Sequence, residues 1–456
     1  MKLDSKSLRE GSVFKSVIIY TIPIILTGWL QLLFNAADLI VIGWFRGSDS
    51  VAAVGATGAL TNLIINLFIG LSVGGGVTVA QALGAGNKQD VSEAVHTTLF
   101  VAFISGIWLT FFGVMFSERF LILMGTPDGK LLSGATVYMR IYFCGIIFSM
   151  LYNFGSAILR AAGDTRSPLI FLIIAGTINV VFNIVFVALF DMDVEGVALA
   201  TSISQAISAI LVLRALIKRK DECRFQFKLI RIHKKALLKI LRIGLPAGLQ
   251  GSLFSISNVI IQSSVNSFGK EYISGSAASA SIEGFCYIAM NSFQQTAMNF
   301  CGQNYGAGEF GRVKHITVVC LTTVATMGLV LGNLIYLFGN SLLGIYIVDS
   351  PEAIACGMER MKYMLIPYFL CGIMDTITGS MRGIGSSVIP MIVSVMGVCV
   401  MRIVWIYTVF AMPQYHSFAG LFISYPISWT LTFAAILVSF IIIMKKKSRH
   451  IEKMSD

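Results

Sequence analysis

Charged residues are scarce in this chain, and their scarcity excludes a soluble globular protein. Only 12% of the 456 residues are Asp, Glu, Lys or Arg, whereas soluble domains carry about 25%. No Gln-, Pro- or Ser-rich linker and no low-complexity block interrupts the sequence. With 56% hydrophobic residues and a mean hydropathy of +0.80, the composition predicts a membrane protein with many spans.

The motifs of ATP-driven pumps and of common hydrolases are also missing. The sequence has no G-x-x-x-x-G-K-[ST] loop, no nucleophile elbow and no H-E-x-x-H motif. Its eight cysteines form no C-x-x-C pair and no cluster with histidine, which argues against a zinc site and a disulfide framework. We therefore expect no cofactor, and a membrane-embedded enzyme is the weaker class of function.

Twelve long hydrophobic segments are present, most of them separated by short turns. They cover residues 15–44, 52–82, 94–116, 133–160, 167–190, 195–217, 237–267, 275–303, 314–338, 357–382, 388–411 and 418–444. A helix needs roughly 20 apolar residues to cross a bilayer. We predict an all-α polytopic membrane protein with twelve transmembrane helices in two pseudo-symmetric six-helix lobes. The lobes would be residues 1–217 and 237–456, joined by a basic cytoplasmic linker at 218–236. The first segment lacks a cleavage site, so we expect it to be retained.

Lys and Arg collect in the tails and in alternate loops. The loop between the halves holds eleven of them between Arg214 and Arg242. The others in this pattern are Lys2, Lys6, Arg9, Lys15, Lys88, Arg160, Arg166, Arg312, Lys314, Arg382, Lys445, Lys446, Lys447, Arg449 and Lys453. This positive-inside pattern predicts a multi-pass protein of the cell (plasma) membrane with both termini cytoplasmic. It also accounts for the net charge of +11 through topology and anionic lipid, so no nucleic-acid partner is expected.

The two halves repeat each other. The turn QALGAG beginning at Gln81 recurs as QNYGAG beginning at Gln303, an offset of 222 residues. Arg160, Gly163 and Pro168 recur as Arg382, Gly385 and Pro390 at the same offset, and Pro23 recurs near Pro246 with a slip of one. Repeated halves are typical of secondary transporters, whose substrate sites lie between the repeats near the middle of the membrane.

One carboxylate, Asp38, lies inside the first span. A charged Asp at a helix centre is unfavourable by roughly 2.5–3.5 kcal/mol, so such a residue is a functional candidate by default. Gln31 and Asn35 share its helix face at spacings of seven and three residues. Two further pairs lie four residues apart on one face each: Asn179 with Asn183, and Thr201 with Gln205. These oxygen-bearing groups would suit a small cation, and they could equally join helices together.

The second half offers Glu283, Asp375 and Arg402 within its spans. Carboxylates that face a central cavity would attract organic cations. The alternative for Asp375 is an internal ion pair with Arg402. Glu283 and Asp375 are therefore candidate cavity residues, together with Gln31, Asn35 and Gln205 from the first half.

The motifs FNAADLIVIG, QALGAG, LRAAGDTRSP, INVVFN, GVALAT, GQNYGAG and MRGIGSS, in this order, resemble those of multidrug and toxic compound extrusion (MATE) transporters. The resemblance covers nearly the whole chain. It implies two six-helix lobes, a V-shaped central cavity, and antiport of a substrate against sodium or protons.

In its amino lobe the chain resembles most the DinF-like branch. The resemblance implies a cation-coupling site formed by Asp38, Asn179, Asn183 and Thr201, which could bind sodium. Asn183 stands where that branch has a second Asp, so one carboxylate replaces two. Asp375 resembles an acidic position of NorM-like members, whose glutamate in the seventh helix has no counterpart here; Asn258 and Gln262 lie in that segment instead.

These features predict a secondary transporter, expected to be a monomer in membrane lipid, that exports cationic or amphiphilic compounds. A flippase for a lipid-linked substrate is the rival within the same superfamily. Its pyrophosphate would favour a basic cavity, whereas the intramembrane charges counted here, Asp38, Glu283 and Asp375 against Arg402, are mainly acidic. The sequence alone leaves the choice between sodium and protons open.

Overall fold

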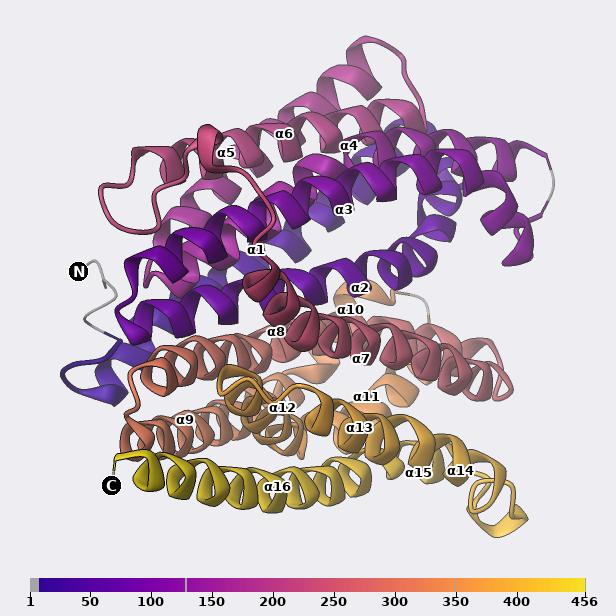
Figure 1. Cartoon of the computed structure of the whole chain (residues 1–456). Coiled ribbons are helices and arrows are strands. Elements are labelled where there is room, and N and C mark those ends of the chain that lie inside the picture. Colours follow the sequence, from indigo (N-terminus) through magenta and orange to yellow (C-terminus); the bar gives the residue numbers. More distant parts are fainter. Residues whose placement is uncertain (1–7, 128, 349, 456) are drawn as a thin grey trace. The chain divides into compact units, whose positions relative to one another are not determined.

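The computed structural model describes residues 8–127, 129–348 and 350–455, and these residues form helices without any strand (Figure 1). The predicted tail charges Lys2 and Lys6 lie outside the described residues. The all-α prediction is confirmed. Helices are expected in lipid because each span must satisfy its own backbone hydrogen bonds there.

The first half of the chain contains six long helices. Their bounds are α1 Val13–Arg46, α2 Ser48–Ala85, α3 Lys88–Leu123, α4 Lys130–Ala161, α5 Arg166–Ile184 and α6 Val194–Lys218. A π-helical turn, η1 (Val185–Leu189), continues α5. Each of the six corresponds to one predicted hydrophobic segment.

The second half contains the remaining six spans, two of them interrupted. Its long helices are α7 Lys234–Asn266, α8 Lys270–Gly306, α9 Phe310–Leu337, α11 Pro351–Leu365, α12 Tyr368–Gly383 and α16 Ser424–Ser455, and two helices of seven residues each are α13 Val388–Ser394 and α14 Met401–Tyr407. The short helices are η2 Phe227–Leu229, α10 Gly339–Tyr346, η4 Pro413–Tyr415 and α15 Phe418–Phe422, and the π-helical turn η3 (Val395–Val400) joins α13 to α14.

Nine stretches of the described chain are long and apolar enough to cross a membrane, and the bent pair α11 and α12, which meet at 43°, adds a tenth. Helices α7 and α8 are less apolar, but their 33 and 37 residues exceed the length that a span requires. The twelve predicted segments are therefore all helical, which confirms the predicted fold class.

Contacts divide the described residues into two compact units, which we call the amino-terminal and carboxyl-terminal units. The amino-terminal unit contains residues 22–248; the carboxyl-terminal unit contains residues 8–21 and those from 249 onward. Helices α1 and α7 thus each contribute residues to both units. The predicted lobe limits, 1–217 and 237–456, remain a prediction.

The repeated turns have the same backbone conformation in both halves. Gly86 and Gly308, the last residues of the two G-A-G turns, have φ values of +71° and +79°. Gly163 and Gly385 have φ values of +91° and +82°. This region of φ is open to glycine and strained for other residues, which explains why glycine recurs at these four turns at an offset of 222.

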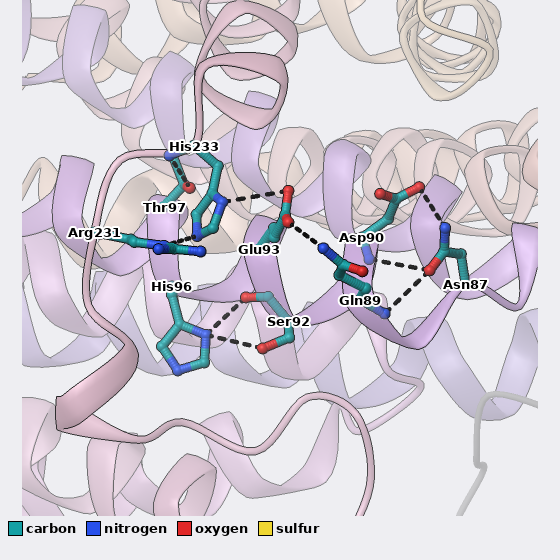
Figure 2. A network of polar contacts seen from close by, with 9 residues as sticks. All are labelled: Asn87, Gln89, Asp90, Ser92, Glu93, His96, Thr97, Arg231 and His233. Atoms are coloured by element: carbon teal, nitrogen blue, oxygen red, sulfur yellow. Dashed lines mark hydrogen bonds and ion pairs between the residues drawn. The ribbon is translucent and has the colours of Figure 1, made fainter.

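The central linker, residues 219–233, is attached to α3 of the amino-terminal unit. Cys223 and Phe225 are buried, and the Gln226 N–H donates to His96 Nε2 at 3.1 Å. The His233 N–H donates to Thr97 Oγ1 at 3.2 Å, and Figure 2 shows its imidazole pointing toward a carboxylate of α3. The linker is therefore a packed element and not a free tether.

Candidate cation and substrate site

Helix α1 carries three polar side chains along one face of the amino-terminal unit. Gln31, Asn35 and Asp38 line a cavity of about 140 Å³ whose lining residues all belong to this unit. Their spacing of four and three residues places them one above another on the helix, as the sequence predicted. Asp38 itself is half-buried.

Helix α5 contributes two buried asparagines to the same place. Asn179 and Asn183 are one helical turn apart, and the π-helical turn η1 begins two residues after Asn183. Such turns often occur at functional sites because they change the direction of side chains. A Cβ atom at Gly176 would lie only 1.9 Å from the Phe34 ring, so glycine at this position lets α1 pack closely on α5.

The four predicted cation-coupling residues meet in one hydrogen-bond cluster. Asn183 Nδ2 donates to Asp38 Oδ1, and Thr201 Oγ1 donates to Asp38 Oδ2 at 3.4 Å. Asn183 Nδ2 also lies 3.3 Å from Asn179 Oδ1, and Asn179 Nδ2 lies 3.4 Å from Thr201 Oγ1. Residues far apart in the chain therefore surround a single carboxylate with amide and hydroxyl groups.

The donor set of this cluster fits a small cation or a proton. Asn183 Oδ1 and Gln205 Oε1 are buried and accept no hydrogen bond from the described residues. Hard cations prefer oxygen ligands of this kind, and a protonated Asp38 could donate to such an oxygen instead. Asp38 is the one acidic residue among those that line the cavity, so the site can carry a single negative charge.

The cavity also contains polar residues that the sequence analysis did not select. Ser149, Tyr152, Asn153, Ser204 and Ser208 complete its polar lining. Asn153 Nδ2 donates to the Ser149 carbonyl at 2.8 Å, so these two residues already share one face of α4. Uncharged polar residues are common in transmembrane helices, so their presence alone does not mark a cavity. The spacing of four between Ser149 and Asn153 was the only sequence pattern that could have placed them on one cavity-lining face.

Glu283 is not part of this cavity. It lies in the carboxyl-terminal unit and forms a two-pronged ion pair with Arg360, with Nη2–Oε2 at 2.9 Å and Nε–Oε1 at 3.0 Å. Ser279 Oγ donates a third bond to Glu283 at 2.7 Å. Arg360 lies inside the predicted span 357–382, so the predicted count of intramembrane charges, which omitted Arg360, is wrong. The positive charge of Arg360 therefore neutralises the negative charge of Glu283 within the carboxyl-terminal unit.

Asp375 is buried in α12, and among the described residues it forms no ion pair with Arg402. Arg402 instead donates from Nε to Ser428 Oγ at 2.9 Å, and its guanidinium carbon lies 3.7 Å from the centre of the Tyr425 ring. The proposed Asp375–Arg402 pair is therefore absent.

Arg382 was predicted to be a loop charge, and this prediction is wrong. Its side chain is 8% exposed and donates from Nη2 to Gln250 Oε1 at 2.8 Å. It belongs to the last turn of α12, so its hydrogen-bond partner and burial depend on packing that a loop count does not reveal.

The family model MatE matches the chain twice, at residues 23–185 and 246–408. The two matches begin at Pro23 and Pro246, the prolines that lie inside α1 and α7. The double match supports the repeat inferred from the sequence.

Similar proteins and structures cover nearly the whole chain. A protein of Bacillus subtilis (strain 168) named probable multidrug resistance protein YoeA is 27% identical over 447 residues, 96% of each chain. A protein of Thermotoga maritima named probable multidrug resistance protein NorM is 25% identical, covering 85% of this chain and 84% of that protein. A crystal structure of MATE in the bent conformation matches with a TM-score of 0.88 at 20% identity over 100% of both chains. With 326 of 456 residues inside the two family matches, this chain belongs to the MatE family of multi-pass membrane transporters and is not an enzyme.

Proposed function

We propose that this protein is a secondary active antiporter that exports cationic or amphiphilic organic compounds in exchange for protons or sodium ions. The observation that carries the proposal is the single carboxylate, Asp38, held by Asn183 and Thr201 beside a polar cavity. Relatives named multidrug resistance proteins supply the class of substrate. In this proposal Asp38, Asn179, Asn183 and Thr201 couple the ion, and Gln31, Asn35 and Gln205 contact the substrate.

The size of the cavity favours a change of shape during transport. A volume of about 140 Å³ holds four or five water molecules at about 30 Å³ each, whereas sites for drug-sized ligands measure about 300–1,000 Å³. The cavity as it stands can admit an ion and water but not a whole drug molecule. Alternation between two states, one binding the ion at Asp38 and one binding the substrate, would meet both requirements.

Counterflow in proteoliposomes tests the function directly. Purified protein would be reconstituted, loaded with a fluorescent organic cation, and given an inward sodium gradient or an inward proton gradient in separate experiments. We expect uphill movement of the cation under one gradient and none when that gradient is collapsed by an ionophore. Movement that is the same with and without both gradients would contradict antiport.

A flippase for a lipid-linked substrate is the second candidate, and one observation favours it. The carboxyl-terminal unit buries Arg382 and Arg402 and pairs Arg360 with Glu283, so its buried charges are not mainly acidic. Translocation of a fluorescent lipid-linked pyrophosphate sugar between leaflets, at the same protein density as in the counterflow assay, would discriminate. Sugar-lipid translocation without organic-cation export would favour the flippase.

We propose a plasma-membrane monomer with both termini cytoplasmic, and one labelling experiment tests the orientation. In a Cys144→Ser, Cys356→Ser background, Lys220→Cys places an exposed thiol on the central linker. We expect an impermeant maleimide to label it only after the cells are permeabilised. Labelling in intact cells would show that the linker is extracellular and would contradict the proposed orientation.

Native Cys223, three residues away, provides the internal control for this experiment. Burial raises the pKa of its thiol to about 12, so its reactive thiolate at neutral pH should be about a thousandfold rarer than that of a free cysteine. Cys223 should therefore remain unlabelled while the linker is folded.

Asp375 is proposed to recognise cationic substrates from the carboxyl-terminal unit. We expect Asp375→Asn to weaken binding of cationic substrates about tenfold more than binding of neutral ones, because it removes a carboxylate that forms no ion pair with the described residues. Scintillation proximity binding to purified protein measures this ratio. Arg402→Ala is the comparison: it should leave the ratio unchanged and lower the melting temperature through the lost contact with Tyr425. An unchanged ratio in Asp375→Asn would exclude the role.

A further inference from the structure

The outer side of the central linker is unusually apolar. Every residue from 226 to 232 is exposed. Four of them are large apolar side chains, with exposed fractions of 66% for Phe227, 46% for Leu229, 37% for Ile230 and 48% for Ile232. Lys228 and Arg231 lie between them, and we call these six residues the linker surface. A contiguous exposed apolar patch marks an interaction surface.

The inner side of the linker is firmly packed, so the exposure of the linker surface does not result from a loose loop. Phe225 packs on His96 with ring centroids 5.5 Å apart, and Phe227 meets Phe225 edge to face at 5.0 Å. His233 Nδ1 lies 3.3 Å from Glu93 Oε2, a contact visible in Figure 2. These contacts hold one side of the segment against α3, and Arg231 Nε donates to His233 Nε2 at 3.2 Å within the linker, while the six residues of the linker surface stay exposed.

The attachment points fix the depth of the linker surface along α3. Helix α3 begins with Lys88, Asp90 and Glu93 and becomes apolar in the following turns. The linker contacts His96 and Thr97, which lie about 14 Å or less from Lys88 at 1.5 Å per residue. The residues that flank the linker surface, Gln226 and His233, are therefore attached at the boundary between the charged start of α3 and its apolar span. We expect this boundary to lie at the level of the lipid headgroups.

The charge around the linker surface is strongly positive. Residues 218–235 contain eight Lys or Arg, and their only acidic residues are Asp221 and Glu222. Both acids are already paired, Asp221 with Arg219 at 2.5 Å and Glu222 with Lys88 at 3.2 Å. A partner of complementary charge must therefore be anionic, and the adjacent membrane leaflet provides one.

We propose that the linker surface inserts into the headgroup–acyl boundary of an anionic leaflet, so that the central linker is an interfacial lipid-binding strap. Phe227, Leu229, Ile230 and Ile232 would enter the acyl boundary, as the apolar face of an interfacial segment does. Lys228 and Arg231 would remain at the level of the lipid phosphates. The proposal concerns a surface separate from the Asp38 cavity and does not depend on what the protein transports.

Depth-resolved quenching tests the proposal. Phe227→Cys would be labelled with bimane in the Cys144→Ser, Cys356→Ser background and reconstituted in phosphatidylcholine with or without phosphatidylglycerol. We expect nitroxide lipids labelled near the headgroup to quench the bimane, and aqueous iodide to quench it weakly, in the anionic membrane. Iodide quenching without lipid quenching would overturn the proposal.

Charge variants test the anionic preference. Replacing Arg224 and Lys228 by Gln, singly and together, should shift the ratio of lipid to iodide quenching toward water by up to about fivefold for each charge. Lys130→Gln removes an exposed charge from the first residue of α4 and should leave the ratio unchanged. Equal lipid quenching in neutral and anionic membranes would overturn the proposed preference for anionic lipid.

Discussion

Asp38→Asn is expected to abolish coupled export while the protein still folds. The substitution preserves shape and removes the only carboxylate of the four-residue cluster, so the site can no longer change its charge with the ion. The asparagine oxygen can still accept from Asn183 Nδ2, and its NH2 group can donate to Thr201 Oγ1, which should preserve packing. Uphill substrate movement in proteoliposomes should fall to the protein-free background, with an unchanged elution profile and a melting temperature within a few degrees.

Two neutral variants provide the matched comparison. Asn179→Ala and Thr201→Ala each remove one uncharged ligand, so we expect each to weaken uphill transport by about tenfold without abolishing it. Ser208→Ala, on the same cavity but outside the cluster, should transport normally. If Asp38→Asn drives uphill transport at the wild-type rate, Asp38 is not the coupling group.

Among the single substitutions predicted here, one that breaks the Glu283–Arg360 pair is expected to lower the free energy of unfolding the most. Arg360→Met leaves the Glu283 carboxylate buried with Ser279 as its remaining hydrogen-bond partner, and removal of one member of a buried pair typically costs about 3–5 kcal/mol. The guanidinium of Arg360 also lies 5.0 Å from the Phe422 ring centre, so packing is lost as well. Thermal unfolding followed by size-exclusion fluorescence should show a lowered melting temperature.

The double variant Arg360→Met, Glu283→Leu distinguishes the loss of stability caused by an unpaired charge from the loss caused by poorer packing. It removes both charges, so it should recover most of the stability lost in Arg360→Met, because no unpaired buried charge remains. Arg140→Met is the control, since Arg140 pairs with Glu118 at 3.4 Å on an exposed surface where such pairs contribute little. A double variant as unstable as Arg360→Met would show that packing around Arg360, and not its charge, holds the region together.

The sequence by itself determined the class of protein, the twelve spans, the repeat and the family. These properties depend on composition and on short local patterns, such as long apolar runs bounded by turns. The glycine turns recur at an offset of 222 because their backbone conformation is local. The helical spacing of Gln31, Asn35 and Asp38 also predicted which face of α1 would line the cavity.

Only the tertiary structure decided which polar groups meet. It brought Asp38 to Asn183 across 145 residues, but it paired Glu283 with Arg360 and kept Arg402 on Ser428 instead of Asp375. It also turned Arg382 from an expected loop charge into a buried donor. Periodicity assigns a residue to a face of its helix, yet the neighbour of that face depends on how helices distant in sequence pack. Pairing between buried charges is therefore a property of the packed helices and not of any one of them.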